Sequence, residues 1–226
     1  MFQLYVSEDK MKITVSVLSK TKDGSEISGD STLKLKLDDG KILVALSDGM
    51  GSGKEANKTS NELIKMIKKL MSAGFEKEAA LELINTNLTM NAKNETFASL
   101  DMGIFDLYTG NLEIIKNCAC PTFIKNDKEV KMIHAISLPT GILSNVDSVT
   151  FDTDIKPGDI IVMCTDGILE ANMEAADKES AFKEFLGNIK TENAKKIADL
   201  ILEESTDKSF GRIKDDMTVI VVKVGN

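Results

Sequence analysis

The chain has 226 residues, of which 42% are hydrophobic, and this is enough for one globular domain with a substantial core. Its net charge of −8 and isoelectric point near 4.9 disfavour nucleic acid and anionic membranes as partners, since both attract basic surfaces. Three cysteines do not make a disulfide framework, and no signal peptide or membrane-spanning apolar run is present. We therefore expect a single domain over residues 1–226 in the cytoplasm.

The first part of the chain has the pattern of strands. Alternating apolar and polar residues predict half-buried strands at Lys12–Ser19 and Thr32–Leu37. A hairpin turn at Asp38–Lys41 leads into the apolar run Ile42–Ser47, which is typical of a strand covered on both faces. This run ends at Asp48.

The next loop, Leu46–Ser60 (LSDGMGSGKEANKTS), is rich in glycine, as nucleotide-binding loops are. A P-loop needs four residues between its glycines and a Ser or Thr after its lysine. Gly49 and Gly53 are separated by three residues, and a glutamate follows Lys54. The dinucleotide fingerprint fails as well, because the glycines run G-x-G-x-G. The loop is therefore not predicted to bind a nucleotide.

Two helices are predicted after this loop. Apolar residues recur every three or four positions from Lys54 to about Ser72, and Gly74 is placed to end that helix. A second helix, Glu76–Ala92, follows a very short connection. The two helices are expected to pack as an antiparallel pair.

The rest of the chain returns to strands and ends in helices and a last strand. A hairpin turn is predicted at Tyr108–Asn111, and an apolar strand within Lys156–Ala171 runs into Asp-Gly. Short strands are expected in FASLDMGIFD, NLEIIKN, PTFIK and EVKMI, helices near Ser180–Leu186 and Asn193–Glu204, and a core strand in KDDMTVIVVKV.

Four aspartates stand where apolar strands begin or end: Asp30, Asp48, Asp166 and Asp215. A buried carboxylate is costly unless it is paired or bound to a cation. Strand ends can meet at one edge of a sheet, so these acids are candidates for a divalent metal site. The alternative is that the Asp-Gly pairs are only turns.

Other catalytic centres have few candidate residues. The single histidine, His134, lies in an apolar stretch, where a structural role is favoured over a catalytic one. Cys118 and Cys120 are too close together for a zinc knuckle and are expected to be small core or turn residues.

Taken together and in this order, SGDS, LSDGMGSGKEA, TDGILEA and DDMTVIVV resemble the metal-dependent serine/threonine phosphatases of the PPM, or type 2C, class. FASLDMGIFDLYTG, CPTFIK and LPTGIL resemble one branch of it, the phosphatase domain of stage II sporulation protein E. The resemblance spans roughly Thr14 to Val224. It implies an α+β fold, a four-layer αββα sandwich of two antiparallel β-sheets flanked by helices.

The resemblance also implies two divalent metal ions, manganese or magnesium, at one end of the sandwich. By position, the implied metal ligands are Asp30, Asp48, Gly49, Asp166 and Asp215. Asp48 would bridge both ions, and Asp48, Asp166 and Asp215 are the expected catalytic residues. The Gly49 carbonyl would bind one ion, and Asp30 would act directly or through water.

One feature of the eukaryotic members is missing. They hold the phosphate with an arginine near the N-terminal acid, whereas Arg212 is the only arginine here. Lys54 is a candidate to replace it, although a lysine at a helix start is more often only solvated. Asp216 stands where eukaryotic relatives carry asparagine and is expected to support the ligands from behind.

By resemblance, the substrate is a phosphorylated anti-sigma-factor antagonist, whose dephosphorylation activates a sporulation sigma factor, and a homodimer is one assembly that the resemblance allows. The alternative is a catalytically silent binding module with the same fold. The family carries this domain behind a membrane region, so the chain is expected to be a C-terminal fragment that is tethered to the membrane in a longer protein.

The glycines after Asp48 are expected either to form a joint between the helix pair and the metal ligands or only to let the backbone approach the ions.

Overall fold

The computed structural model describes residues 10–51, 53–90, 97–144, 146–172 and 174–226. The elements, in chain order, are β1 (Lys12–Lys20), β2 (Asp30–Lys36), β3 (Lys41–Asp48), α1 (Gly53–Ser72), α2 (Lys77–Met90), β4 (Leu100–Asp106), β5 (Asn111–Asn117), β6 (Thr122–Lys125), β7 (Val130–Ile133), β8 (Val149–Asp154), β9 (Ile160–Cys164), α3 (Asp166–Glu170), α4 (Lys178–Asn188), α5 (Ala194–Lys208) and β10 (Met217–Gly225).

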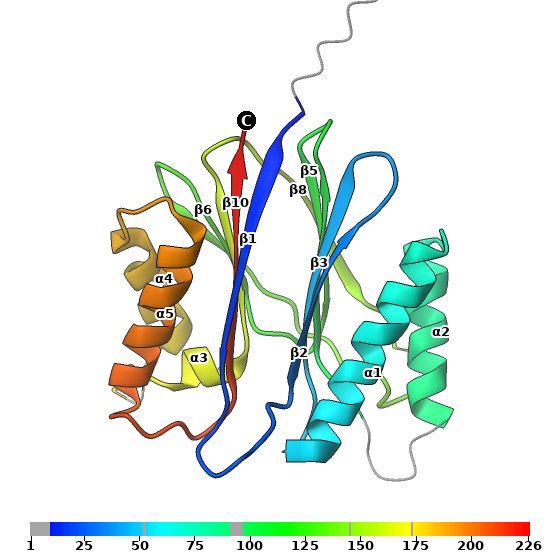
Figure 1. Ribbon diagram of the computed structural model, residues 1–226, viewed down its shortest axis with the longest axis horizontal. Helices are drawn as coiled ribbons and strands as arrows, with labels where there is room; N and C mark the ends of the chain where they lie inside the picture. Colours follow the sequence, from blue (N-terminus) through cyan, green and yellow to red (C-terminus); the bar gives the residue numbers. More distant parts are fainter. Residues whose placement is uncertain (1–9, 52, 91–96, 145, 173) are drawn as a thin grey trace, which may run out of the picture.

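The strands form two five-stranded antiparallel sheets that pack face to face. Their strand orders are β1-β10-β9-β6-β7 and β2-β3-β4-β5-β8. Helices α3, α4 and α5 cover the outer face of the first sheet, and α1 and α2 cover that of the second (Figure 1). The expected α+β fold, a four-layer αββα sandwich, is confirmed.

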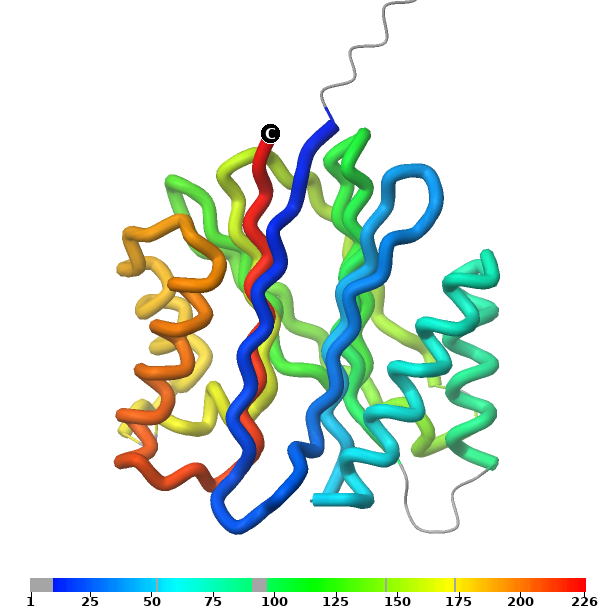
Figure 2. Tube along the Cα trace, viewed as in Figure 1, coloured from blue at the N-terminus to red at the C-terminus, as the bar shows by residue number. Residues whose placement is uncertain are grey.

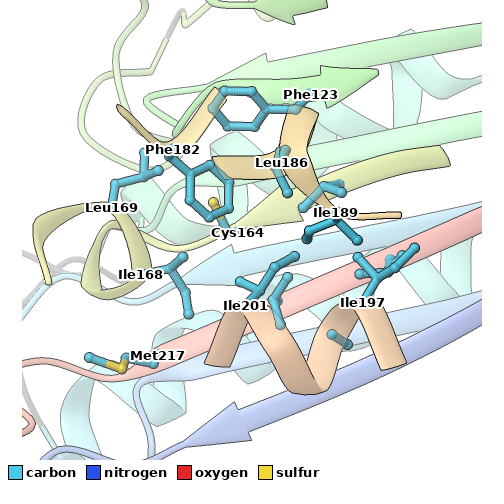
Figure 3. Packing of buried hydrophobic residues seen from close by; sticks show 14 of the residues in the cluster. Phe123, Cys164, Ile168, Leu169, Phe182, Leu186, Ile189, Ile197, Ile201 and Met217 are labelled. Atoms are coloured by element: carbon cyan, nitrogen blue, oxygen red, sulfur yellow. The ribbon is translucent and has the colours of Figure 1, made fainter. Parts of the chain in front are cut away.

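Three apolar clusters hold the layers together. One lies between the sheets and includes Phe105, Ile161 and Val222, all 0% exposed. A second lies under α1 and α2, and a third lies between the first sheet and α3 to α5. In the third cluster Phe182 of α4 packs edge to face on Phe123 of β6, with ring centroids 5.0 Å apart (Figure 3). Burial of these side chains is the main force that fixes the four layers.

The register of the strands decides which residues meet at the ends of the sandwich. Asp30 is the first residue of β2 and lies directly opposite Asp48, the last residue of β3. A slip by one residue would turn every side chain of β2 to the other face, so the buried face of the sheet fixes this pairing.

Both predicted hairpin turns are confirmed. Lys41 N donates to Asp38 O at 3.2 Å, and the two central residues, Asp39 and Gly40, have φ of 55° and 74°, as a type I′ turn requires. Gly110 has φ of 77° in the second turn, where Asp106 accepts two backbone hydrogen bonds.

The structure differs from the predicted elements in several places, and one of them is the short helix α3, which is not among the expected elements. β2 begins at Asp30, two residues before the predicted start, because Asp30 pairs with the end of β3. The edge strand Val149–Asp154 is not among the expected elements, since only two of its six residues, Val149 and Phe151, are apolar. The second helix ends at Met90 in the structure, and residues 91–92 of its predicted range lie outside the described residues.

Substitution in the helix-covered cluster tests the packing. Ile201 of α5 is 0% exposed and faces β10 (Figure 3), whereas its neighbour Leu200 is 41% exposed. Ile201→Ala should lower the free energy of unfolding by about 2–5 kcal/mol because it leaves a cavity. Leu200→Ala, the matched control, should cost under about 1 kcal/mol. Urea titration measures both, and equal losses would contradict the packing described here.

Candidate metal centre

The four predicted acids lie at one edge of the sandwich. Asp30 begins β2, Asp48 ends β3, Asp166 begins α3, and Asp215 stands two residues before β10. The start of β2, the end of β3, α3 and the segment leading into β10 meet at the lower edge of the molecule (Figures 1 and 2). Segments far apart in the sequence thus bring their carboxylates to one place.

Burial and the charges of neighbouring acids raise the pKa values of three of these carboxylates. Burial, and then the charges of Asp30, Asp166 and Asp215, raise the pKa of Asp48 to about 8. Burial is also the largest cause that raises the pKa of Asp30 to about 7. Desolvation followed by the charge of Asp215 raises the pKa of Asp166, although this residue lies at the surface. A cation between these groups would offset the repulsion.

A hydrogen bond across the two sheets orients Asp30. The Thr165 hydroxyl, between β9 and α3, donates to Asp30 Oδ2 at 3.1 Å. The same hydroxyl accepts from Thr218 N of β10 at 2.9 Å. Asp30 of one sheet is therefore held by residues at the ends of strands in the other. Thr165 directly precedes Asp166 in the sequence, and this adjacency is the signal that could have identified it.

The second carboxylate oxygen of Asp30, Oδ1, indicates whether a metal ion would be favourable at this edge. Asp30 Oδ1 is buried and has no hydrogen-bond partner among the described residues. An acceptor in this position is costly unless a cation or water meets it. Carboxylate and backbone oxygens are the ligands of hard divalent ions such as magnesium and manganese, so this donor set fits such ions.

The described residues contain no group of three or more His, Cys, Asp or Glu side chains already arranged around a single ion position. The acids are close enough to shift one another's pKa values but are not drawn together as a finished coordination sphere.

The glycines of the two Asp-Gly pairs allow close backbone approach. A Cβ on Gly49 would lie 1.9 Å from the carbonyl oxygen of Ala56 in α1. A Cβ on Gly167 would lie 2.2 Å from the carbonyl oxygen of Asp216. Neither glycine has a positive φ, so they are not simple turn glycines. Gly51 and Gly53, with φ of 104° and 64°, are the ones whose conformation requires glycine.

Asp216 holds the backbone that precedes Asp30. It is 5% exposed and accepts from Gly29 N at 2.6 Å and from Lys22 N at 2.8 Å. These two bonds fix the segment that leads into Asp30. This position agrees with the supporting role expected for Asp216.

The structure also gives the positions of Lys54, His134 and the cysteines. Lys54 is exposed at the start of α1. His134 is exposed and lies 3.8 Å from Glu179, so its apolar neighbours in the sequence do not bury it, and the structural role favoured over a catalytic one stays a prediction. Cys118 is exposed, with φ of 49°, whereas Cys164 is buried.

Adding a methyl group at Gly49 tests the contact between β3 and α1. Gly49→Ala should destabilise the fold by about 1–3 kcal/mol, because the new atom overlaps the backbone of α1. It should also weaken manganese binding, because the helix must move away from the metal-binding edge. Gly187→Ala is the control: its Cβ would lie 3.9 Å from Val130, so stability should stay within about 1 kcal/mol of the parent. Thermal unfolding with and without manganese measures both effects, and an unchanged Gly49→Ala protein would contradict the contact.

Replacing Asp48 by asparagine tests the repulsion among the acids at the edge. Without metal, Asp48→Asn should be at least as stable as the parent protein, since it removes a buried carboxylate that the charges of four other aspartates oppose. The parent should gain about 2.7 kcal/mol from manganese at 100 times its dissociation constant, and the variant should lose most of this gain. Asp106→Asn, at the far end of β4, is the control that should keep the gain. A full manganese gain in Asp48→Asn would rule out Asp48 as a ligand.

The sequence family described as Stage II sporulation protein E (SpoIIE) matches residues 38–225. Stage II sporulation protein E of Bacillus subtilis (strain 168) is 33% identical over 218 residues, which are 96% of this chain and 26% of that protein. The protein of the same name from Priestia megaterium is 34% identical over 94% of this chain and 36% of its own length. The chain thus spans about a quarter to a third of the curated relatives that it matches.

Solved structures show the same fold. The structure of the PP2C phosphatase domain and a fragment of the regulatory domain of SpoIIE from Bacillus subtilis superposes with a TM-score of 0.89 at 33% identity, over 96% of this chain and 64% of that one. RsbX in complex with magnesium has a TM-score of 0.72 at 20% identity, over 94% of this chain and 96% of that one, and shows a shared fold. None of the described helices is both long and apolar enough to span a membrane. The chain belongs to the stage II sporulation protein E family of PP2C-type serine phosphatase domains, which are metal-dependent.

Proposed function

We propose that this domain hydrolyses phosphoserine in a protein substrate with two divalent metal ions held by Asp30, Asp48, Gly49, Asp166 and Asp215. The observation that carries the proposal is the meeting of four aspartates from both sheets at one edge, where the pKa of Asp48 is raised to about 8. Such a site concentrates negative charge, which a bound cation would neutralise.

When bound, a pair of divalent ions supplies activation of water as the nucleophile and neutralisation of phosphoryl charge. The chain's own part is to hold and orient the ligands. Thr165 fixes the rotamer of Asp30 through Oδ2, which leaves Oδ1 free for an ion. Asp216 anchors Gly29 N, so the backbone before Asp30 is held in place.

A cysteine mechanism is disfavoured by the same acids. Cys118 is the exposed cysteine near them, and a thiolate is needed for nucleophilic attack. Desolvation, and then the charges of Asp166 and Asp48, raise the pKa of Cys118. The thiol is therefore kept protonated where a cysteine phosphatase would need it ionised.

Substrate recognition is proposed to rest on the surface of a partner protein. The chain has one arginine, Arg212, which is exposed and follows α5. Without an arginine clamp at the N-terminal acid, the phosphate itself supplies less of the binding energy. An exposed lysine such as Lys54 would be a weaker point charge than a bidentate arginine.

Similarity to stage II sporulation protein E supports a more specific proposal. The substrate would be a phosphorylated anti-sigma-factor antagonist, and its dephosphorylation would activate a sporulation sigma factor. By the same similarity, we propose that the domain acts while it is tethered to a membrane as part of a longer protein.

Turnover measurements test this function and the silent-module alternative together. With manganese, the chain should hydrolyse a phosphoserine antagonist protein far more efficiently than p-nitrophenyl phosphate, because recognition rests on the partner. Asp48→Asn should lower kcat by at least about a hundredfold, and EDTA should abolish activity until manganese is restored. Asp106→Asn should retain full activity. Metal-independent turnover would refute the metal mechanism, whereas binding of the phosphoprotein without any turnover would establish the silent module.

A further inference from the structure

A fully buried charged cluster lies inside the sandwich, apart from the four acids at the edge. Lys116 is 0% exposed, and its Nζ lies 2.8 Å from Asp101 Oδ1 and donates to Thr122 Oγ1 at 2.8 Å. The Thr122 hydroxyl in turn donates to Asp101 Oδ2 at 2.7 Å. We call these three residues the cross-sheet triad. Asp101 Oδ1 makes no hydrogen bond among the described residues, so its contact with Lys116 is an ion pair.

The triad joins the two sheets. Asp101 of β4 and Lys116 of β5 are directly opposite each other in the second sheet. Thr122 begins β6, which belongs to the first sheet. Its hydroxyl is thus the link between an ion pair of one sheet and a strand of the other. Apolar contacts between sheets tolerate sliding, whereas hydrogen bonds of fixed length and direction do not.

On the second sheet, the triad lies next to the strand end that carries Asp48. Asp101 pairs with Leu46, two residues before Asp48. Between them Ser99 holds the strand end, because its hydroxyl accepts from Asp48 N at 3.1 Å and its backbone N donates to Asp48 O at 2.8 Å.

On the first sheet, the triad lies next to the strand that leads to Asp166. Phe123, which follows Thr122, pairs with Val162 of β9. Three residues further along, Thr165 makes the hydrogen bond to Asp30. The strands joined by the triad are therefore direct neighbours of β3, which ends at Asp48, and of β9, which leads to Asp166.

We propose that Asp101, Lys116 and Thr122 are positioning residues that set the separation of the two sheets at the metal-binding edge. The triad keeps Asp48 and Asp166 at the distance that two ions require, although none of its members touches an ion. A general contribution to stability would be served as well by apolar residues of similar volume, because a buried ion pair is not by itself a strong source of stability. This inference rests on the metal centre proposed above.

The test uses Thr122, because removing Lys116 or Asp101 leaves a buried charge unpaired and endangers the fold. Thr122→Val keeps the volume but removes the hydroxyl, and Lys116 and Asp101 still pair. Thr122→Ser keeps the hydroxyl and removes a methyl group. Leu112→Ala, in the inter-sheet cluster near the other end of β5, is a control for general loosening of the core.

Manganese affinity of the full chain is measured by electron paramagnetic resonance of free manganese, well below the melting temperature of each variant. Thr122→Val should weaken binding by about tenfold or more, the loss typical when a supporting contact of a metal site is removed. Thr122→Ser and Leu112→Ala should bind as the parent does. Parent-like affinity in Thr122→Val, or equal weakening in Thr122→Ser or Leu112→Ala, would overturn the proposal. A parent protein that binds no manganese would instead refute the metal centre, and the positioning role would fall with it.

Discussion

The electrostatic repulsion among four aspartates at one edge of the sandwich is the constraint around which the rest of the structure is arranged. Asp48 shows this effect clearly, since burial and the neighbouring acids raise its pKa to about 8. Such crowding opposes folding when the acids are ionised, and the two sheets must supply the energy that holds them together. Burial of apolar side chains in the three clusters, one between the sheets and one under each helical layer, supplies this energy.

The aspartates at the metal-binding edge and Asp101 in the interior have partners of different kinds. The hydrogen bonds that Asp30 and Asp216 accept come from hydroxyl and backbone N–H groups, which orient a carboxylate without cancelling its charge. Asp101, in contrast, is neutralised inside the protein by Lys116 at 2.8 Å. The charge of the edge acids is therefore left for a cation, while the charge of Asp101 is used to join the sheets.

The local pattern of the sequence predicts most strands and helices, but contacts across the sandwich lie beyond it. Period-two alternation identifies β1 and β2, yet only their pairing places Asp30 opposite Asp48. The Asp-Gly pairs look like turns in the sequence, whereas Gly49 is required by the backbone of α1. Lys116 is an ordinary lysine in a short strand, and its burial depends on a partner from another sheet, so no pattern within its own strand predicts it.

Helix α1 supports both strand ends of the metal-binding edge, and this bears on the glycine-rich loop. Asn57 Nδ2 donates to Ser28 O at 2.8 Å, and Ser60 Oγ donates to Gly29 O at 2.5 Å, directly before Asp30. The same helix contacts Gly49 so closely that no side chain fits there. A displacement of α1 would therefore act on the Asp30 and Asp48 strands together. Gly51 and Gly53, which lie between β3 and this helix, have positive φ, a conformation that favours glycine. A joint that passes a movement of α1 to Asp48 therefore stays a prediction, and so does the approach of the backbone to the ions.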